Sequence, residues 1–86
     1  MTTCDEVWAD DSTVLCNDGH VLEIFGRVDG RRFHLVLQRP KIEVIERKRS
    51  TRVVITAIHS SSAFDCDPAR ADDVRAFAAR LAAALP

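Results

Sequence analysis

Alternation of apolar and polar residues in the middle of the chain predicts antiparallel strands. In the stretch "HVLEIFGRV", residues 20–28, Leu22, Ile24 and Val28 share one parity, and charged residues take the other. A period of two is typical of a strand with one buried face. Residues 12–16, "STVLC", form an earlier β-prone run, and "NDG" at 17–19 predicts a tight turn between the two strands.

A hairpin is predicted at Asp29-Gly30, because this dipeptide between two alternating runs is typical of a two-residue turn with Gly30 at positive φ. The partner strand is "RRFHLVLQ", residues 31–38, which ends before Pro40 because proline has no N–H to donate. Its inward-facing residues are predicted to be Phe33, Leu35 and Leu37.

Two further strands follow the proline. "KIEVIER", residues 41–47, alternates, whereas "RVVITAIH", residues 52–59, has apolar residues of both parities. The second pattern suits a strand that is covered on both faces or that crosses the seam of a barrel. We expect an exposed turn between these strands, near Arg49 to Thr51. The first eleven residues are either a flexible arm or a short extra strand.

The last third of the chain changes to a helical period. Asp67-Pro68 predicts a helix start, because Asp accepts hydrogen bonds from free N–H groups and Pro at the first position wastes no donor. One apolar stripe then recurs at spacings of three and four: Val74, Phe77, Ala78, Leu81, Ala82 and Leu85. This pattern predicts an amphipathic helix over residues 68–85 that packs on a sheet.

These elements predict a single α+β domain spanning residues 1–86. We expect a strongly bent antiparallel sheet, or a partly open barrel, of five to six strands capped by one C-terminal helix. The 47% of hydrophobic residues support a real core. No alternation of strand and helix occurs along the chain, which argues against a parallel sheet.

The order "RRFHLVLQ", "KIEVIERK", "STRVVITAI" and "SAFDCDPARADDVRAFAARLAAAL" resembles the second half of a pleckstrin-homology-like (PH-like) domain. Short bacterial PH-like domains are the nearest match. The resemblance implies a bent barrel whose open end is capped by the helix, used mainly for protein or lipid contacts. A full domain of that family has seven strands before the helix. Its phosphoinositide-binding members carry basic residues in the first hairpin, which "STVLCNDGHVLEI" lacks, so no lipid-binding residues are carried over.

The charge balance and the cysteines narrow the function classes. A formal net charge of −1 argues against a general nucleic-acid binder. No apolar run approaches the roughly 18 residues of a membrane span, and "MTTCDEVWADD" lacks the basic start and apolar block of a signal peptide. The three cysteines, an odd count, suggest free thiols in a reducing compartment, so we expect a cytoplasmic protein.

A basic cluster surrounds the predicted turn in "IERKRSTR". Its cations, with two that precede it, are Arg39, Lys41, Arg47, Lys48, Arg49 and Arg52. One interpretation is a contact site for an anionic lipid or nucleic acid. The other, which the interspersed Glu43 and Glu46 favour, is a solvated hairpin tip whose charges keep a strand edge from aggregating.

Outward apolar residues give a second candidate surface. Phe25 lies on the predicted outer face of its strand, and Val21 and Val36 have similar parity. Such residues mark a partner surface unless curvature of the sheet buries both faces. Both interpretations remain open at this stage.

The sequence predicts neither catalysis nor a metal centre. Cys16 and His20 form a C-x3-H pair, but the close pairs typical of structural zinc sites are missing. "HSSSAFD", residues 59–65, lacks the glycine-rich context of a hydrolase and is interpreted as a polar connection into the helix. We therefore expect a non-enzymatic binding module without a cofactor, with a protein partner, self or other. The alternative is an anion binder that uses residues 39–52.

Overall fold

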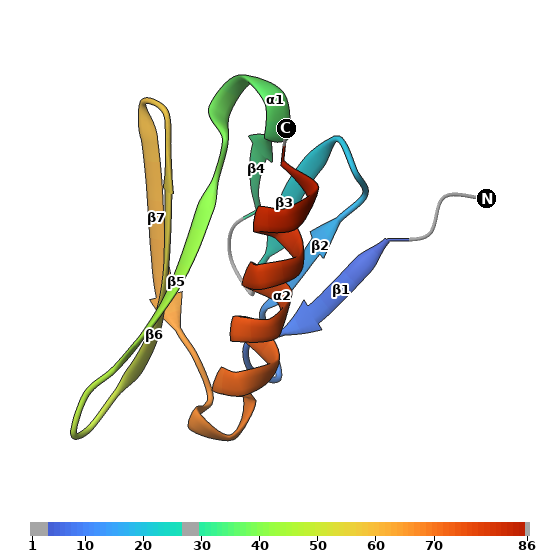
Figure 1. Ribbon diagram of the computed structural model, residues 1–86. Coiled ribbons are helices and arrows are strands. Elements are labelled where there is room, and N and C mark those ends of the chain that lie inside the picture. Colours follow the sequence, from blue (N-terminus) through green and yellow to red (C-terminus); the bar gives the residue numbers. More distant parts are fainter. Residues whose placement is uncertain (1–3, 27–29, 86) are drawn as a thin grey trace.

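The computed structural model describes residues 4–26 and 30–85, and these form two antiparallel sheets and a C-terminal helix (Figure 1). Sheet A has the strand order β1 (Asp5–Trp8), β2 (Val14–Asn17), β3 (Val21–Phe25) and β4 (Gly30–His34). Sheet B has the order β5 (Lys41–Glu46), β6 (Thr51–Ala57) and β7 (Ser60–Asp65). The predicted α+β class and the antiparallel pairing are confirmed. The described residues hold seven strands instead of five to six, and the two sheets do not close into a barrel there.

The C-terminal helix begins where the sequence predicts it. A 3₁₀ turn, η1 (Pro68–Arg70), precedes the α-helix α2 (Ala71–Ala84). The Asp67 side chain accepts a hydrogen bond from the Ala69 N–H, 3.0 Å from the carboxylate oxygen. This satisfies one of the N–H groups that every helix start leaves without a partner.

Helix α2 packs against both β1 and β5, and so joins the outer strands of the two sheets. Its buried side chains meet residues from both sheets in one core. The largest fully buried side chains of that core are Leu15, Leu22, Phe33, Val53, Ile55, Val74, Phe77 and Leu81. Two surface ion pairs follow the same arrangement: Arg75 reaches Glu46 of β5 at 3.3 Å, and Arg80 reaches Asp5 of β1 at 2.9 Å.

The strand predicted for residues 31–38 ends early. It stops at His34, and one helical turn, α1 (Leu35–Gln38), carries the chain from sheet A to sheet B. The Leu35 N–H donates to the His20 carbonyl at 3.0 Å, and Arg39 ends the turn in the left-handed conformation, with φ 48°. The chain changes direction here to begin the second sheet. Residues 35–38 therefore form a helical turn, although their sequence alternates as in a strand.

This change corrects the predicted inward set. Phe33 and Leu35 are buried as predicted, but Leu37 is 70% exposed, because it lies on the outer side of α1. Of the three residues predicted to face inward, only Phe33 and Leu35 do so.

Strands β3 and β4 form the predicted hairpin, with Ile24 opposite Arg31. Gly30 is not at positive φ, however; it is a strand residue that pairs with Phe25. The predicted two-residue turn is therefore wrong, and the parts of that prediction that rest on residues 27–29 lie outside the described residues. A Cβ at Gly30 would meet the Ile24 carbonyl oxygen at 3.8 Å, an ordinary contact, so this position does not require glycine.

The earlier turn behaves as its sequence predicts. Gly19 has φ 94°, and its N–H donates to the Asn17 side chain at 2.9 Å. The Asp18 carboxylate accepts from the N–H groups of His20 and Val21 at 2.8 and 2.9 Å. These bonds fix the connection between β2 and β3.

Two segments without a strong strand pattern form edge strands, β1 in sheet A and β7 in sheet B. Residues Asp5–Trp8 form β1, so the first eleven residues contain the extra strand that was one of the two expectations. "SSSAFD", expected to be a polar connection, forms β7 along the edge of sheet B, after a turn in which His59 has φ 61°.

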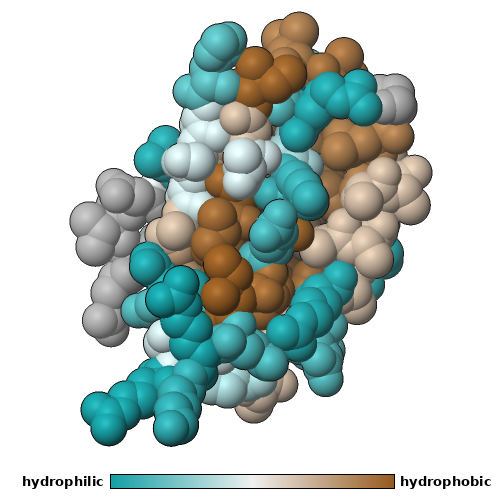
Figure 2. Space-filling view, turned by 60° about the vertical axis from the view of Figure 1, so that its left-hand side comes forward, coloured by the Kyte–Doolittle hydropathy of each residue, from teal (hydrophilic) through white to brown (hydrophobic). Residues whose placement is uncertain are grey.

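Strand β6 is the middle strand of its sheet but is not covered on both faces, since Arg52 and Thr56 are exposed. Figure 2 brings sheet B forward, with hydrophobic atoms visible between hydrophilic ones.

Candidate functional site

The outer face of sheet A carries a row of apolar side chains across three strands. Trp8 of β1 pairs with Val14 of β2, and Val14 pairs with Phe25 of β3. Cross-strand partners on one face have Cβ atoms roughly 4.5–5.5 Å apart, so the three side chains are neighbours. Trp8 is 45% exposed and Phe25 49% exposed, and Val14 lies half-buried between them. We call Trp8, Val14 and Phe25 the aromatic row.

A polar row lies beside the aromatic row on the same face. It runs from Glu6 through Cys16 and Glu23 to Arg32, each residue opposite the next. Glu23 and Arg32 form an ion pair at 3.3 Å. The face therefore has an apolar strip with a charged margin, the composition that protein–protein interfaces show between core and rim.

A disulfide joins Cys4 to Cys16, with the two Cα atoms 6.0 Å apart. That separation lies within the usual range for a bridge. The expectation of free thiols is therefore wrong for these two residues, and it holds for Cys66. An odd number of cysteines does not exclude a disulfide, because one bridge among three cysteines still leaves one free thiol.

The three residues predicted to share a partner surface are brought together only in part. Phe25 is exposed on the outer face of sheet A, and Val21 lies half-buried on the same face, away from the aromatic row. Val36 is 61% exposed, but it belongs to α1, not to sheet A. The sequence interpretation missed Trp8 and Val14, although the parity of Trp8 relative to buried Val7 gave a signal that could have identified the outer face.

The basic stretch does not form one patch. Arg39 and Lys41 lie at the start of β5, whereas the loop 47–50 follows its far end. Five strand residues, 42–46, lie between Lys41 and Arg47, and this separation spans about 20 Å at the usual rise of a strand. The cations predicted to act together are therefore divided between opposite ends of sheet B.

The loop itself is the exposed hairpin turn that was predicted, although it begins two residues earlier. All four of its residues are exposed, and the Arg47 N–H donates to the Ser50 carbonyl at 2.8 Å. Glu46 does not pair with these cations but with Arg75 of α2, and Arg52 lies 3.7 Å from Asp65. Within the described residues, no ion pair holds the side chains of Arg47, Lys48 or Arg49.

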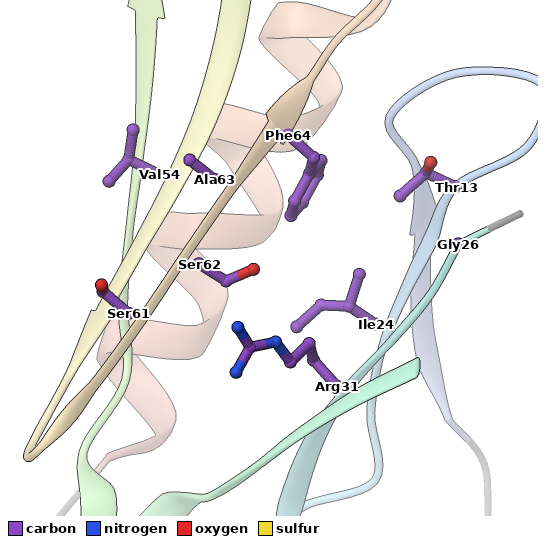
Figure 3. Close-up of a pocket in the computed structure, with 9 residues that line it drawn as sticks. All are labelled: Thr13, Ile24, Gly26, Arg31, Val54, Ser61, Ser62, Ala63 and Phe64. Atoms are coloured by element: carbon purple, nitrogen blue, oxygen red, sulfur yellow. The ribbon is translucent and has the colours of Figure 1, made fainter. Parts of the chain in front are cut away.

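A cleft opens between the two sheets, where β4 and β7 are the outermost strands. Its volume is about 440 Å³. Ile24 and Arg31 enter it from sheet A, and Ser62 and Phe64 enter it from β7 (Figure 3). The Arg31 guanidinium extends toward β7 in that view, so a cation and a hydroxyl group face a cleft with both polar and apolar lining residues.

Two pKa shifts bear on the chemistry of the described residues. Burial raises the pKa of the Cys66 thiol, assisted by the carboxylates of Asp67 and Asp10, so this cysteine is a weak nucleophile. The hydrogen bonds from His20 and Val21 lower the pKa of the exposed Asp18 carboxyl. Among the residues described, no cluster of three His, Cys, Asp or Glu side chains could hold a metal ion.

Comparison with known proteins found no matching family model, no matching curated protein and no matching solved structure. In the described part of the chain, no helix has the length and apolar character needed to cross a membrane.

Proposed function

We propose that this chain is a non-enzymatic binding module of the PH-like class whose aromatic row contacts a partner protein. The PH-like assignment is supported by the seven strands among the described residues, in sheets of four and three, and by the helix that follows them and packs on both sheets. The resemblance implies a scaffold used for contacts, and the binding role itself is argued from the surface.

The observation that carries the proposal is the exposure of two aromatic rings in one cross-strand row. Single exposed hydrophobic residues are ordinary on protein surfaces, but Trp8 and Phe25 flank Val14 without a break. Tryptophan is the residue most enriched among those that dominate interface energetics. A partner that covers this row would remove both rings from water.

The margin of the row favours a different protein over a second copy. Glu6 and Glu23 lie on this face, and Arg32 offsets only part of their charge. Two copies that met through this face would place these carboxylates against each other, which is unfavourable. A partner with an apolar centre and basic margins is complementary.

The chain offers a direct reporter, because Trp8 is its only tryptophan and it has no tyrosine. Immobilised native protein is used to capture partners from cells that produce it, in parallel with Phe25→Ser and with Val36→Ser, an exposed apolar control outside the row. Each captured protein is then purified and titrated against the free chain while Trp8 emission is recorded. We expect a shift to shorter wavelength for the native chain and the control, with binding lost in Phe25→Ser.

Two results would contradict the proposal. One is capture of the same proteins by Phe25→Ser as by the native chain. The other is an unchanged Trp8 emission at saturating partner. If the solution mass of the native chain alone rises with concentration and Phe25→Ser abolishes the rise, the partner is a second copy and the argument from charge is wrong.

A second candidate function is anion binding through the hairpin tip Arg47–Lys48–Arg49. It is favoured by the exposure of three adjacent cations that no ion pair holds within the described residues. Titration with nucleic acid and with anionic vesicles at low and physiological salt tests it, because phosphate contacts weaken steeply as salt rises. Salt-dependent binding that is lost when the three cations are neutralised would favour this function over the first.

A further inference from the structure

The cleft between the sheets combines features that the proposed function does not use. It lies on the inner side of sheet A, because Ile24 and Arg31 face each other there, whereas the aromatic row lies on the outer side. A ligand in the cleft would therefore leave the aromatic row free. The two surfaces can be tested separately.

Arg31 is a charged residue on the inner face of its sheet, where its neighbours are uncharged. The other inward residues of β2, β3 and β4 are buried and uncharged: Leu15, Asn17, Leu22, Ile24 and Phe33. Arg31 continues this row at its open end and is exposed, and no ion pair or side-chain hydrogen bond holds it within the described residues. An arginine presents a planar fork of donors that fits a carboxylate.

Strand β7 lines the opposite wall and has a free edge. In the described part of the chain it pairs with β6 alone, so the backbone groups along its other edge have no strand partner. Residues 61–64 of this edge line the cleft, and Phe64 and Ser62 point into it (Figure 3). An extended peptide can add to such an edge, with main-chain hydrogen bonds giving affinity and alternate side chains giving specificity.

We propose that the cleft binds an extended peptide segment, which adds as a strand along β7 and directs an acidic side chain to Arg31. The charge of Arg31 selects the acidic residue. Ile24 and Phe64 accept an apolar side chain two positions away, since alternate residues of a strand share a face. The ligand class is therefore a peptide with Asp or Glu spaced by two from a branched apolar residue.

The test is a selection from a phage-displayed library of random short peptides against the purified chain. Three targets are compared: the native chain, Arg31→Glu and Arg32→Glu. Arg32 is the matched control, because it is the next residue of β4 and faces the outer side of the sheet. Circular dichroism establishes that each variant is folded before selection. A peptide enriched on the native chain is then synthesised and followed by two-dimensional NMR of the backbone amides.

We expect the native chain and Arg32→Glu to enrich the same acidic motif, and Arg31→Glu to enrich basic peptides instead. Affinity of the acidic peptide should fall at least about tenfold in Arg31→Glu, the loss expected for one charge-assisted hydrogen-bonded pair. The amide signals of β7 should shift. An identical motif on all three targets, or no enrichment over an unrelated protein, overturns the proposal. The solution mass of one further variant, Arg31→Gln, is also measured. Self-association of this variant without peptide binding overturns the proposal, because Arg31 would then only protect the edge of its sheet.

Discussion

Replacing Phe77 with alanine tests how the helix holds the fold together. The ring is completely buried at the centre of the core, where α2 meets both sheets. Removing a buried phenylalanine costs about 3–5 kcal/mol, because the apolar contact is lost and a cavity remains. Folded domains are stable by about 0.05–0.15 kcal/mol per residue, which for 86 residues is about 4–13 kcal/mol. The substitution therefore removes a large share of the stability.

The assay is urea unfolding followed by far-ultraviolet circular dichroism, with thermal unfolding alongside. A change of 1 kcal/mol shifts the melting temperature of a domain of this size by roughly 4–8 °C, so we expect a fall of at least about 12 °C. The control is Ala76→Gly, at an exposed position of the same helix, which should cost about 1 kcal/mol through helix propensity alone. If Phe77→Ala loses no more than this control, the helix is not docked as described and the packing argument fails.

Three further measurements follow from local features. Asp18→Ala should lower the melting temperature more at neutral pH than in acid. The lowered pKa of Asp18 means that its contribution is fully present above the ordinary aspartate value of 3.8 and is lost as the pH falls through the native pKa; equal losses across an acid pH series would contradict this. Titration of thiols without reductant should find one slow-reacting group, Cys66, and denaturation with reductant should release two more; three rapid thiols in the native protein would exclude the disulfide. Neutralising Arg47, Lys48 and Arg49 together should change the melting temperature by only a few degrees, since exposed charges at a hairpin tip contribute little.

The strongly patterned elements could be predicted, and the elements that depend on their neighbours could not. The alternation around Leu22 and Ile24 and the helical stripe through Phe77 and Leu81 follow from burial of one face, which the sequence records directly. The sequence of β7 lacks an apolar alternation, because three of its residues are serines, which have little intrinsic preference for a strand. It forms because the edge of β6 supplies hydrogen-bond partners.

The candidate surfaces show the same division. Phe25 was identified from parity, but the aromatic row requires the register that brings Trp8 beside Val14, and no local pattern gives that register. Arg31 shares its parity with Phe33, so its inward position could have been found from the sequence. Its place opposite Ser62 could not, because the two residues belong to different sheets.

The position of α2 in the chain has a consequence for biosynthesis. The helix packs on β1 and β5 and carries the arginines that reach Glu46 and Asp5, yet it follows every strand in the sequence. During translation, both sheets therefore leave the ribosome before the element that covers the space between them. The apolar inner faces stay uncovered until the helix emerges, which is the interval in which a nascent chain is most open to chaperones and to aggregation. Folding of this domain is thus completed by residues synthesised after the seven strands that the structure describes.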